Sequence, residues 1–144
     1  MALSDEPSPN PPLLTRERIE AALEGRDWTY HIDSDGDVGG MWDNSFFLFL
    51  RGGANKEILQ VRGRWHRECP IERRTEIRAL LDEWHNTKIW PKGYTKVDDS
   101  GKCWVIAEHS VDWEFGVTDE QLDLMIRGSL VTSLQMFEFL AARL

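Results

Sequence analysis

The segment Phe46–Leu50 is apolar at every position, and this run constrains the fold more than any other feature of the chain. As a strand, it would direct Phe47 and Phe49 to one face of a sheet and its even-numbered residues to the other. A strand with one solvated face should alternate apolar and polar side chains. The segment is therefore either a central strand covered on both faces or a strand whose second face packs on a partner.

Strand-like alternation also occurs elsewhere in the chain. In Glu57–Trp65, for example, Leu59, Val61 and Trp65 share one face, and polar side chains occupy the other. The remaining strands that we predict are Trp28–Ile32, followed by an Asp-rich turn, and a hairpin of Tyr94–Val97 with Lys102–Val111. In the last of these, Trp104 and Ile106 oppose Val105 and Ala107, so it too is apolar on both faces.

Three segments have the 3.6-residue periodicity of amphipathic helices. We predict helices over Thr15–Glu24, over Ile71–Asn86 and from Thr118 to the C-terminus. Thr118 and Gln121 form a capping-box pattern at the start of the last one. The order is then helix, three strands, helix, two strands, helix. Consecutive hairpins imply an α+β fold with an antiparallel sheet.

Length and charge restrict the organisation and the partners. We expect a flexible tail over residues 1–12, which is rich in proline, and one domain over residues 13–144. The net charge of −8 argues against nucleic acid as a partner. The longest apolar run is far below the roughly 20 residues that cross a bilayer, and the N-terminus is no signal peptide. With only two cysteines, the expected location is the cytoplasm.

No motif in the sequence indicates catalysis. Asp33–Asp37 has too early a glycine for an EF-hand and is typical of a turn. His66 and Cys69 have the spacing of metal ligands, but the other histidines and Cys103 are scattered singly. We therefore expect neither an enzyme nor a cofactor or metal.

Several short motifs resemble the YbjN domain, a bacterial family of sensory transduction regulators. The resemblance extends from about Leu14 to Leu140 and rests on these segments: Leu14–Ile19, Trp28–Tyr30, Trp42 before the Phe-rich run, Leu59–Val61 reaching Trp65, Leu81–Asn86, and Gly116–Thr118 followed by Gln121 and Leu122. It implies a fold like that of type III secretion chaperones, with the element order given above. It brings no catalytic residues with it.

The expected function is therefore a non-catalytic protein-binding module, chaperone-like or regulatory, acting in stress or signalling regulation. Its candidate binding surface consists of the aromatic and apolar residues Trp42, Phe47, Phe49, Trp104 and Ile106. Two alternatives stay open. One is a structural homodimer without a client, and the other is a small-ligand binder or enzyme using His66, Cys69 and nearby arginines. Whether Phe47 and Phe49 lie in the core or at an interface also stays open.

Overall fold

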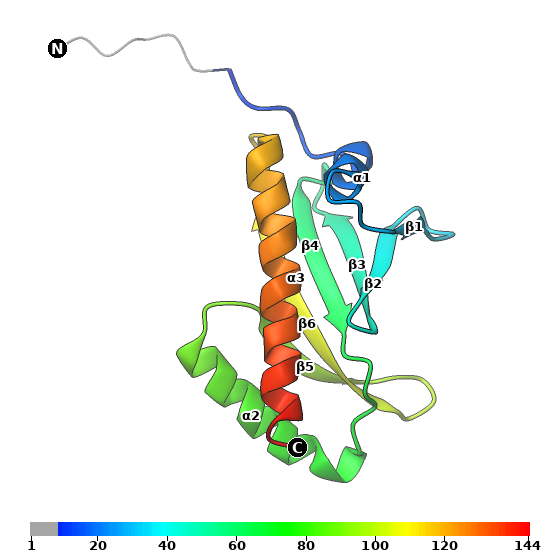
Figure 1. Cartoon of the computed structure of the whole chain (residues 1–144), viewed down its shortest axis with the longest axis vertical. Coiled ribbons are helices and arrows are strands. Elements are labelled where there is room, and N and C mark those ends of the chain that lie inside the picture. The colour runs from blue at the N-terminus through cyan, green and yellow to red at the C-terminus, as the bar shows by residue number, and fades with distance from the viewer. Residues whose placement is uncertain (1–8) are drawn as a thin grey trace, which may run out of the picture.

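The computed structural model describes residues 9–144 and has three α-helices and six strands, with one more strand before the second helix than the sequence predicts (Figure 1). The helices are α1 (Arg16–Glu24), α2 (Arg74–Thr87) and α3 (Asp119–Ala141), with a 3-10 turn (Ile71–Arg73) before α2. The strands are β1 (His31–Ile32), β2 (Val38–Trp42), β3 (Ser45–Gly52), β4 (Ile58–Arg64), β5 (Lys92–Val97) and β6 (Cys103–Asp112).

The strands form one antiparallel sheet in the order β1-β2-β3-β4-β6-β5. β3 and β4 are central, and β4 pairs with β6 across the insertion of α2 and β5. The register places Phe47 opposite Gly63 and Gly63 opposite Ala107. Directly paired residues share a face, so the register assigns every strand residue to one side of the sheet.

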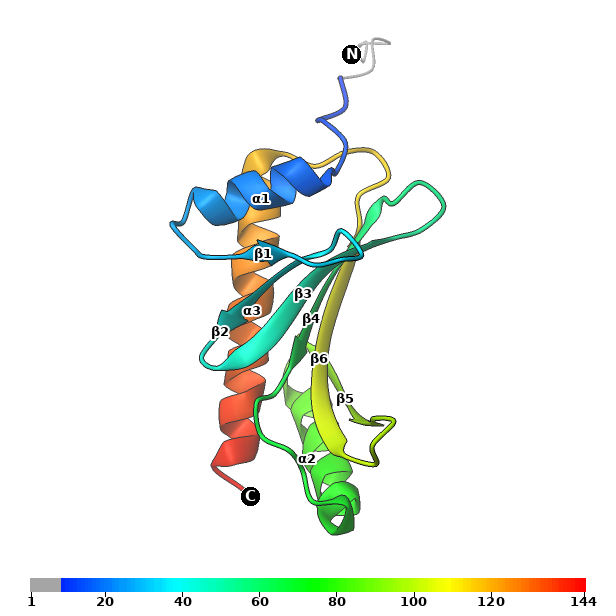
Figure 2. The same ribbon diagram turned by 90° about the vertical axis from the view of Figure 1, so that its right-hand side faces the viewer.

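All three helices pack on the same face of this sheet. In Figure 2, α3 runs along that face, with α1 crossing near its N-terminal end and α2 near its C-terminal end. The core lies between these helices and the strands. Its fully buried side chains include Ile19 of α1, Ile77 of α2, and Ile126 and Leu140 of α3. Among residues 9–144, no helix covers the opposite face (Figure 2).

The predicted starts of the first and last helices are confirmed by their caps, whereas α2 begins at Arg74, three residues later than predicted, and has no side-chain cap. The Thr15 hydroxyl accepts a hydrogen bond from the backbone N–H of Arg18, at 3.2 Å. At α3, the Thr118 hydroxyl accepts from the Gln121 N–H and the Gln121 side chain accepts from the Thr118 N–H, both at 3.0 Å. These contacts satisfy donors that the first turn leaves without helical partners.

The first predicted strand is wrong in its extent. Only His31–Ile32 is extended and paired, while Trp28 and Tyr30 pack beside the core outside the sheet. The strand that pairs with β3 is instead β2, which we did not predict because it contains Gly39 and Gly40. Glycine weakens isolated strands. Here it is required, because a Cβ on Gly40 would lie 2.7 Å from the ring of Trp42.

Two further glycines let large side chains reach the backbone of the sheet. The ring of Phe47 lies directly over Gly63, where a Cβ would overlap it. A Cβ on Gly93 would lie 2.7 Å from the sulfur of Met136 in α3 and 2.8 Å from a methyl group of Leu81 in α2. The Phe47 ring and two helices therefore approach the backbone of the sheet closely at these positions.

The chain before α1 runs against the start of α3. Of the flexible tail expected over residues 1–12, residues 1–8 lie outside the described residues. The Pro12 carbonyl accepts hydrogen bonds from the Val117 N–H at 2.9 Å and from the Arg18 guanidinium at 2.8 Å. Within residues 9–144, no helix has the length and apolar character needed to cross a membrane.

Candidate functional site

The uncovered face of the sheet carries an apolar strip across its centre. Phe46 and Leu48 of β3 and Ile106 of β6 lie on this face, and Met41 of β2 lies beside them. Met41 is 59% exposed, whereas Ile106 is only 5% exposed. Ile106 therefore belongs to the buried floor of the strip, and Met41 lies at its exposed edge. We call this surface, together with Trp104 of β6, the open-face strip.

Two shallow hollows adjoin one another on the open-face strip and share Phe46 and Arg64. The residues that line the first are Met41, Asn44, Phe46, Arg64, His66 and Trp104. The second is lined by Phe46, Leu48, Arg62, Arg64 and Ile106. The lining therefore contains two arginines and no carboxylate.

A polar network fixes the side of the strip nearest β5. Arg62 donates to Glu108 at 3.1 Å and to Gln60 at 2.7 Å, and Gln60 donates to Ser110 at 3.1 Å. The Tyr94 hydroxyl donates to the same Glu108 carboxylate at 2.6 Å. Burial and this hydrogen bond raise the pKa of Tyr94 to about 12, so Tyr94 stays a donor at neutral pH.

Trp104 is held at both its ring face and its edge. The guanidinium of Arg64 lies 4.4 Å from the ring centroid, and the indole N–H donates to Asp98 at 2.8 Å. Asp98 also accepts from Ser100 and from the backbone N–H of Lys102. These hydrogen bonds, led by that of Trp104, hold the pKa of Asp98 well below its ordinary value. Asp98 is therefore ionised at neutral pH and holds the Trp104 indole in place.

The structure divides the five residues predicted as a binding surface between the two faces. Trp104 and Ile106 lie on the open face, as the strip requires. Trp42, Phe47 and Phe49 lie on the helix-covered face, where both phenylalanines contact the edge of the Trp42 ring. Because Phe47 is 0% and Phe49 is 2% exposed, their assignment to a binding surface is wrong, and both belong to the core.

Sequence reasoning missed Phe46, Leu48 and Arg64 as parts of the surface. The alternation in Phe46–Leu50 separated the two sets of side chains correctly. It contains no signal for which set the helices cover, because both sets are apolar. Only the pairing of β3 with β4 could have decided this, since Leu48 pairs with the polar Arg62.

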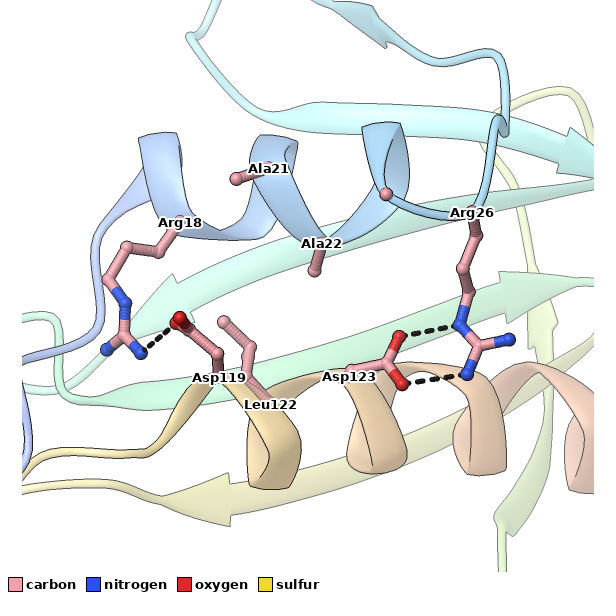
Figure 3. Close-up of a pocket in the computed structure, with 8 residues that line it drawn as sticks. Arg18, Ala21, Ala22, Arg26, Asp119, Leu122 and Asp123 are labelled. Atoms are coloured by element: carbon pink, nitrogen blue, oxygen red, sulfur yellow. Dashed lines mark hydrogen bonds and ion pairs between the residues drawn. The ribbon is translucent and has the colours of Figure 1, made fainter.

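A third hollow, of about 500 Å³, lies between α1 and the start of α3 (Figure 3). Two arginines of α1 and its following turn point into it, and each is already paired. Arg18 donates to Asp119 at 2.7 Å, and Arg26 donates to both oxygens of Asp123 at 2.6 and 2.7 Å. The pairing with Arg26 lowers the pKa of Asp123. These ion pairs join α1 to α3 and leave no unpaired charge for an anionic ligand.

The residues considered for metal binding and catalysis are not arranged for either. Cys69 and Cys103 pair across an isolated antiparallel bridge and are both buried. Burial raises the pKa of Cys69 to about 11, which suppresses the nucleophilic thiolate. His66 is exposed, and its ring packs against the ring of Trp65 in a T-shaped arrangement.

In the part of the chain that the structure describes, one acidic group has the spacing of metal ligands. It consists of Asp33, Asp35 and Asp37, with carboxylate oxygens within 4.8 Å of one another. Asp33 accepts hydrogen bonds at 2.9 Å from the backbone N–H groups of Asp35 and Asp37. This pattern is typical of an Asx turn, which is the structure that the sequence predicts here.

Comparisons with known proteins identify the family. The profile of YbjN, described as "Putative bacterial sensory transduction regulator", matches residues 15–142. A search of curated proteins gave no significant match. The chain is similar to the crystal structure of "YbjN, a putative transcription regulator from E. coli", with a TM-score of 0.72 and 14% identity over 90% of this chain and 94% of that one.

It is also similar to an uncharacterized protein from Methanothermobacter thermautotrophicus. That match has a TM-score of 0.54 and 11% identity, and covers 90% of this chain and 99% of the other. At these identities the two structures show the fold alone. The family profile, however, spans almost all of the described residues, and the motifs of the sequence resemble the same family. The chain therefore belongs to the YbjN family.

Proposed function

We propose that the protein is a non-catalytic regulatory module that binds a segment of another polypeptide on the open-face strip. The observation that carries the proposal is the asymmetry of the sheet. Three helices cover one face, whereas Phe46, Leu48 and Met41 lie partly exposed on the other. Contiguous apolar surface rimmed by polar groups is typical of protein interaction sites.

The family description supports a regulatory role, because it names sensory transduction regulators. The E. coli structure is described as "a putative transcription regulator", which also names a regulatory role, while the net charge of −8 of this chain argues against DNA as its own partner. A regulatory role can be exercised through binding alone, without catalysis. The strip is the surface in the described residues that best fits this task.

The proposal is tested by capturing partners from the native host with matched variants. Leu48→Glu places a charge on the strip, and Leu124→Glu places one on α3, at a side chain that is 68% exposed and outside the strip. We expect proteins captured by the wild type to be retained by Leu124→Glu and lost with Leu48→Glu. Equal capture by both variants, each shown to be folded by circular dichroism, contradicts the proposal.

Light scattering on the same variants distinguishes the proposed function from the alternative of a structural homodimer. A second copy could cover the strip through a two-fold contact. In that case the wild type is a dimer at micromolar concentration and Leu48→Glu is a monomer. The proposed function expects the wild type to be a monomer when no partner is present.

A further inference from the structure

The charge around the open-face strip differs from that of the rest of the molecule. The whole chain has a net charge of −8. The two hollows nevertheless present Arg62 and Arg64 and no carboxylate. These cations attract negative charge on a partner, whereas the net negative charge of the rest of the protein repels it. They therefore favour a partner whose acidic groups lie only in the segment that contacts this surface.

The two arginines of the hollows differ in how they are paired. Arg62 donates to Glu108, so its charge is compensated within the sheet. Arg64 has no carboxylate within salt-bridge distance among residues 9–144, and its guanidinium is held over the Trp104 ring at 4.4 Å. Lys96, which pairs with Trp104 from β5, is exposed and likewise has no acidic partner in the described part. Around Trp104 there are therefore two cations without a salt-bridge partner, Arg64 and Lys96, and one carboxylate, Asp98, which accepts the indole N–H.

Two acidic residues lie beside this part of the strip, and neither forms an ion pair with Arg64. Glu108 accepts from both Arg62 and Tyr94. Asp98 accepts from Trp104, Ser100 and the backbone of Lys102. The ordered guanidinium of Arg64 is thus available for a carboxylate from outside, and such a pair can form two parallel hydrogen bonds.

The apolar residues beside Arg64 exclude a purely anionic ligand. Phe46, Leu48 and Ile106 form the floor next to the guanidinium. A polyanion or an anionic membrane gains nothing from this floor and is repelled by the net charge of the chain. A second copy docked through the same strip would add further cations to hollows that contain no carboxylate.

Building on the proposed function, we propose that the partner segment is acidic and amphipathic. Its aliphatic or aromatic side chains lie on Phe46, Leu48 and Ile106, and an adjacent Asp or Glu binds Arg64 beside Trp104. The Arg62–Glu108–Tyr94 network holds the neighbouring side chains in place before binding. These side chains therefore lose little conformational entropy when the partner binds.

The test is a selection of random short peptides displayed on phage against the full-length protein. Arg64→Glu reverses the charge on the strip, and Lys56→Glu makes the same change in net charge in the β3–β4 turn. We expect wild type and Lys56→Glu to enrich peptides that combine Asp or Glu with large apolar residues. We expect Arg64→Glu to lose the acidic enrichment, and an enriched peptide to bind it about tenfold or more weakly in fluorescence anisotropy.

Each other result contradicts a defined part of the argument. Apolar peptides enriched without Asp or Glu, and bound equally by Arg64→Glu, overturn the acidic partner but leave the binding face standing. Enriched peptides that bind Leu48→Glu as well as the wild type overturn the binding face itself. A selection that enriches nothing overturns both, and affinity that does not fall with added salt overturns the role of Arg64.

Discussion

The two faces of the sheet use the same kinds of side chains for different purposes. On the covered face, Phe47 and Phe49 are almost inaccessible and contact Trp42. On the open face, Phe46 and Leu48 come from the same strand but stay partly exposed among arginines. The difference shows that apolar character does not by itself mark the core. Whether an apolar side chain of the sheet belongs to the core depends on which face the helices cover.

The largest effect should separate Phe47 from Phe46. Phe47→Ala removes a fully buried ring, so the free energy of unfolding should fall by about 3–5 kcal/mol. Phe46→Ala removes a ring that is only partly buried and should cost about 1 kcal/mol. Urea unfolding followed by circular dichroism measures both. Equal losses for the two variants would mean that the faces are equivalent.

A second prediction concerns the glycine beneath Phe47. In Gly63→Ala, the new methyl group overlaps the Phe47 ring, so the ring must shift and stability should fall by about 1–3 kcal/mol. Gly52→Ala in β3 is the matched control, because a Cβ there meets nothing within 4 Å. Its effect should stay within about 0.5 kcal/mol. Thermal unfolding of the two variants gives the comparison directly.

The third prediction uses pH to distinguish the faces. His109 lies on the covered face between the Trp90 ring and the Ser129 hydroxyl, and burial lowers its pKa. Its folded form therefore stays neutral when the unfolded chain begins to bind a proton, below about pH 6.5. The free energy of unfolding should fall as the pH falls through this range.

His109→Gln should make that pH dependence less steep. Urea unfolding of the wild type and this variant at several pH values provides the measurement. The interpretation fails if His109→Gln keeps the slope of the wild type.

The smallest effect should come from the open face itself. Arg64→Ala removes a cation from the Trp104 ring, which should lower the free energy of unfolding by only about 0.5–1 kcal/mol. Thermal unfolding checks this value. A small loss is what a residue retained for binding should show, whereas a loss as large as that of Phe47→Ala would make Arg64 part of the folding core.

Much of the architecture could be predicted because periodicity and capping are local signals. The alternation in Glu57–Trp65 and the capping box at Thr118 lie within a few residues of the elements they define. β2 could not be predicted, because Gly40 is explained only by Trp42 folding back over it. The order of β4 and β6 in the sheet is equally non-local.

The site was only half predictable for the same reason. Trp104 and Ile106 were found because their strand is apolar on both faces. Phe46 and Phe47 are chemically identical, and no local pattern tells which of them the helices bury. That information lies in Gly63, since a glycine paired with Phe47 leaves room for its ring. A glycine in a predicted central strand is thus a sign of close packing on its face.

The contact of Phe47 with Gly63 also has a consequence for how sequences of this family can change. Because β3 is apolar on both faces, a shift of its register by one residue would cost little in hydrophobic pattern. The ring of Phe47 fits only above a residue without a side chain. We therefore expect the two positions to evolve as a pair, with a smaller residue at 47 wherever 63 is not glycine, while residue 46 on the open face is under no such constraint.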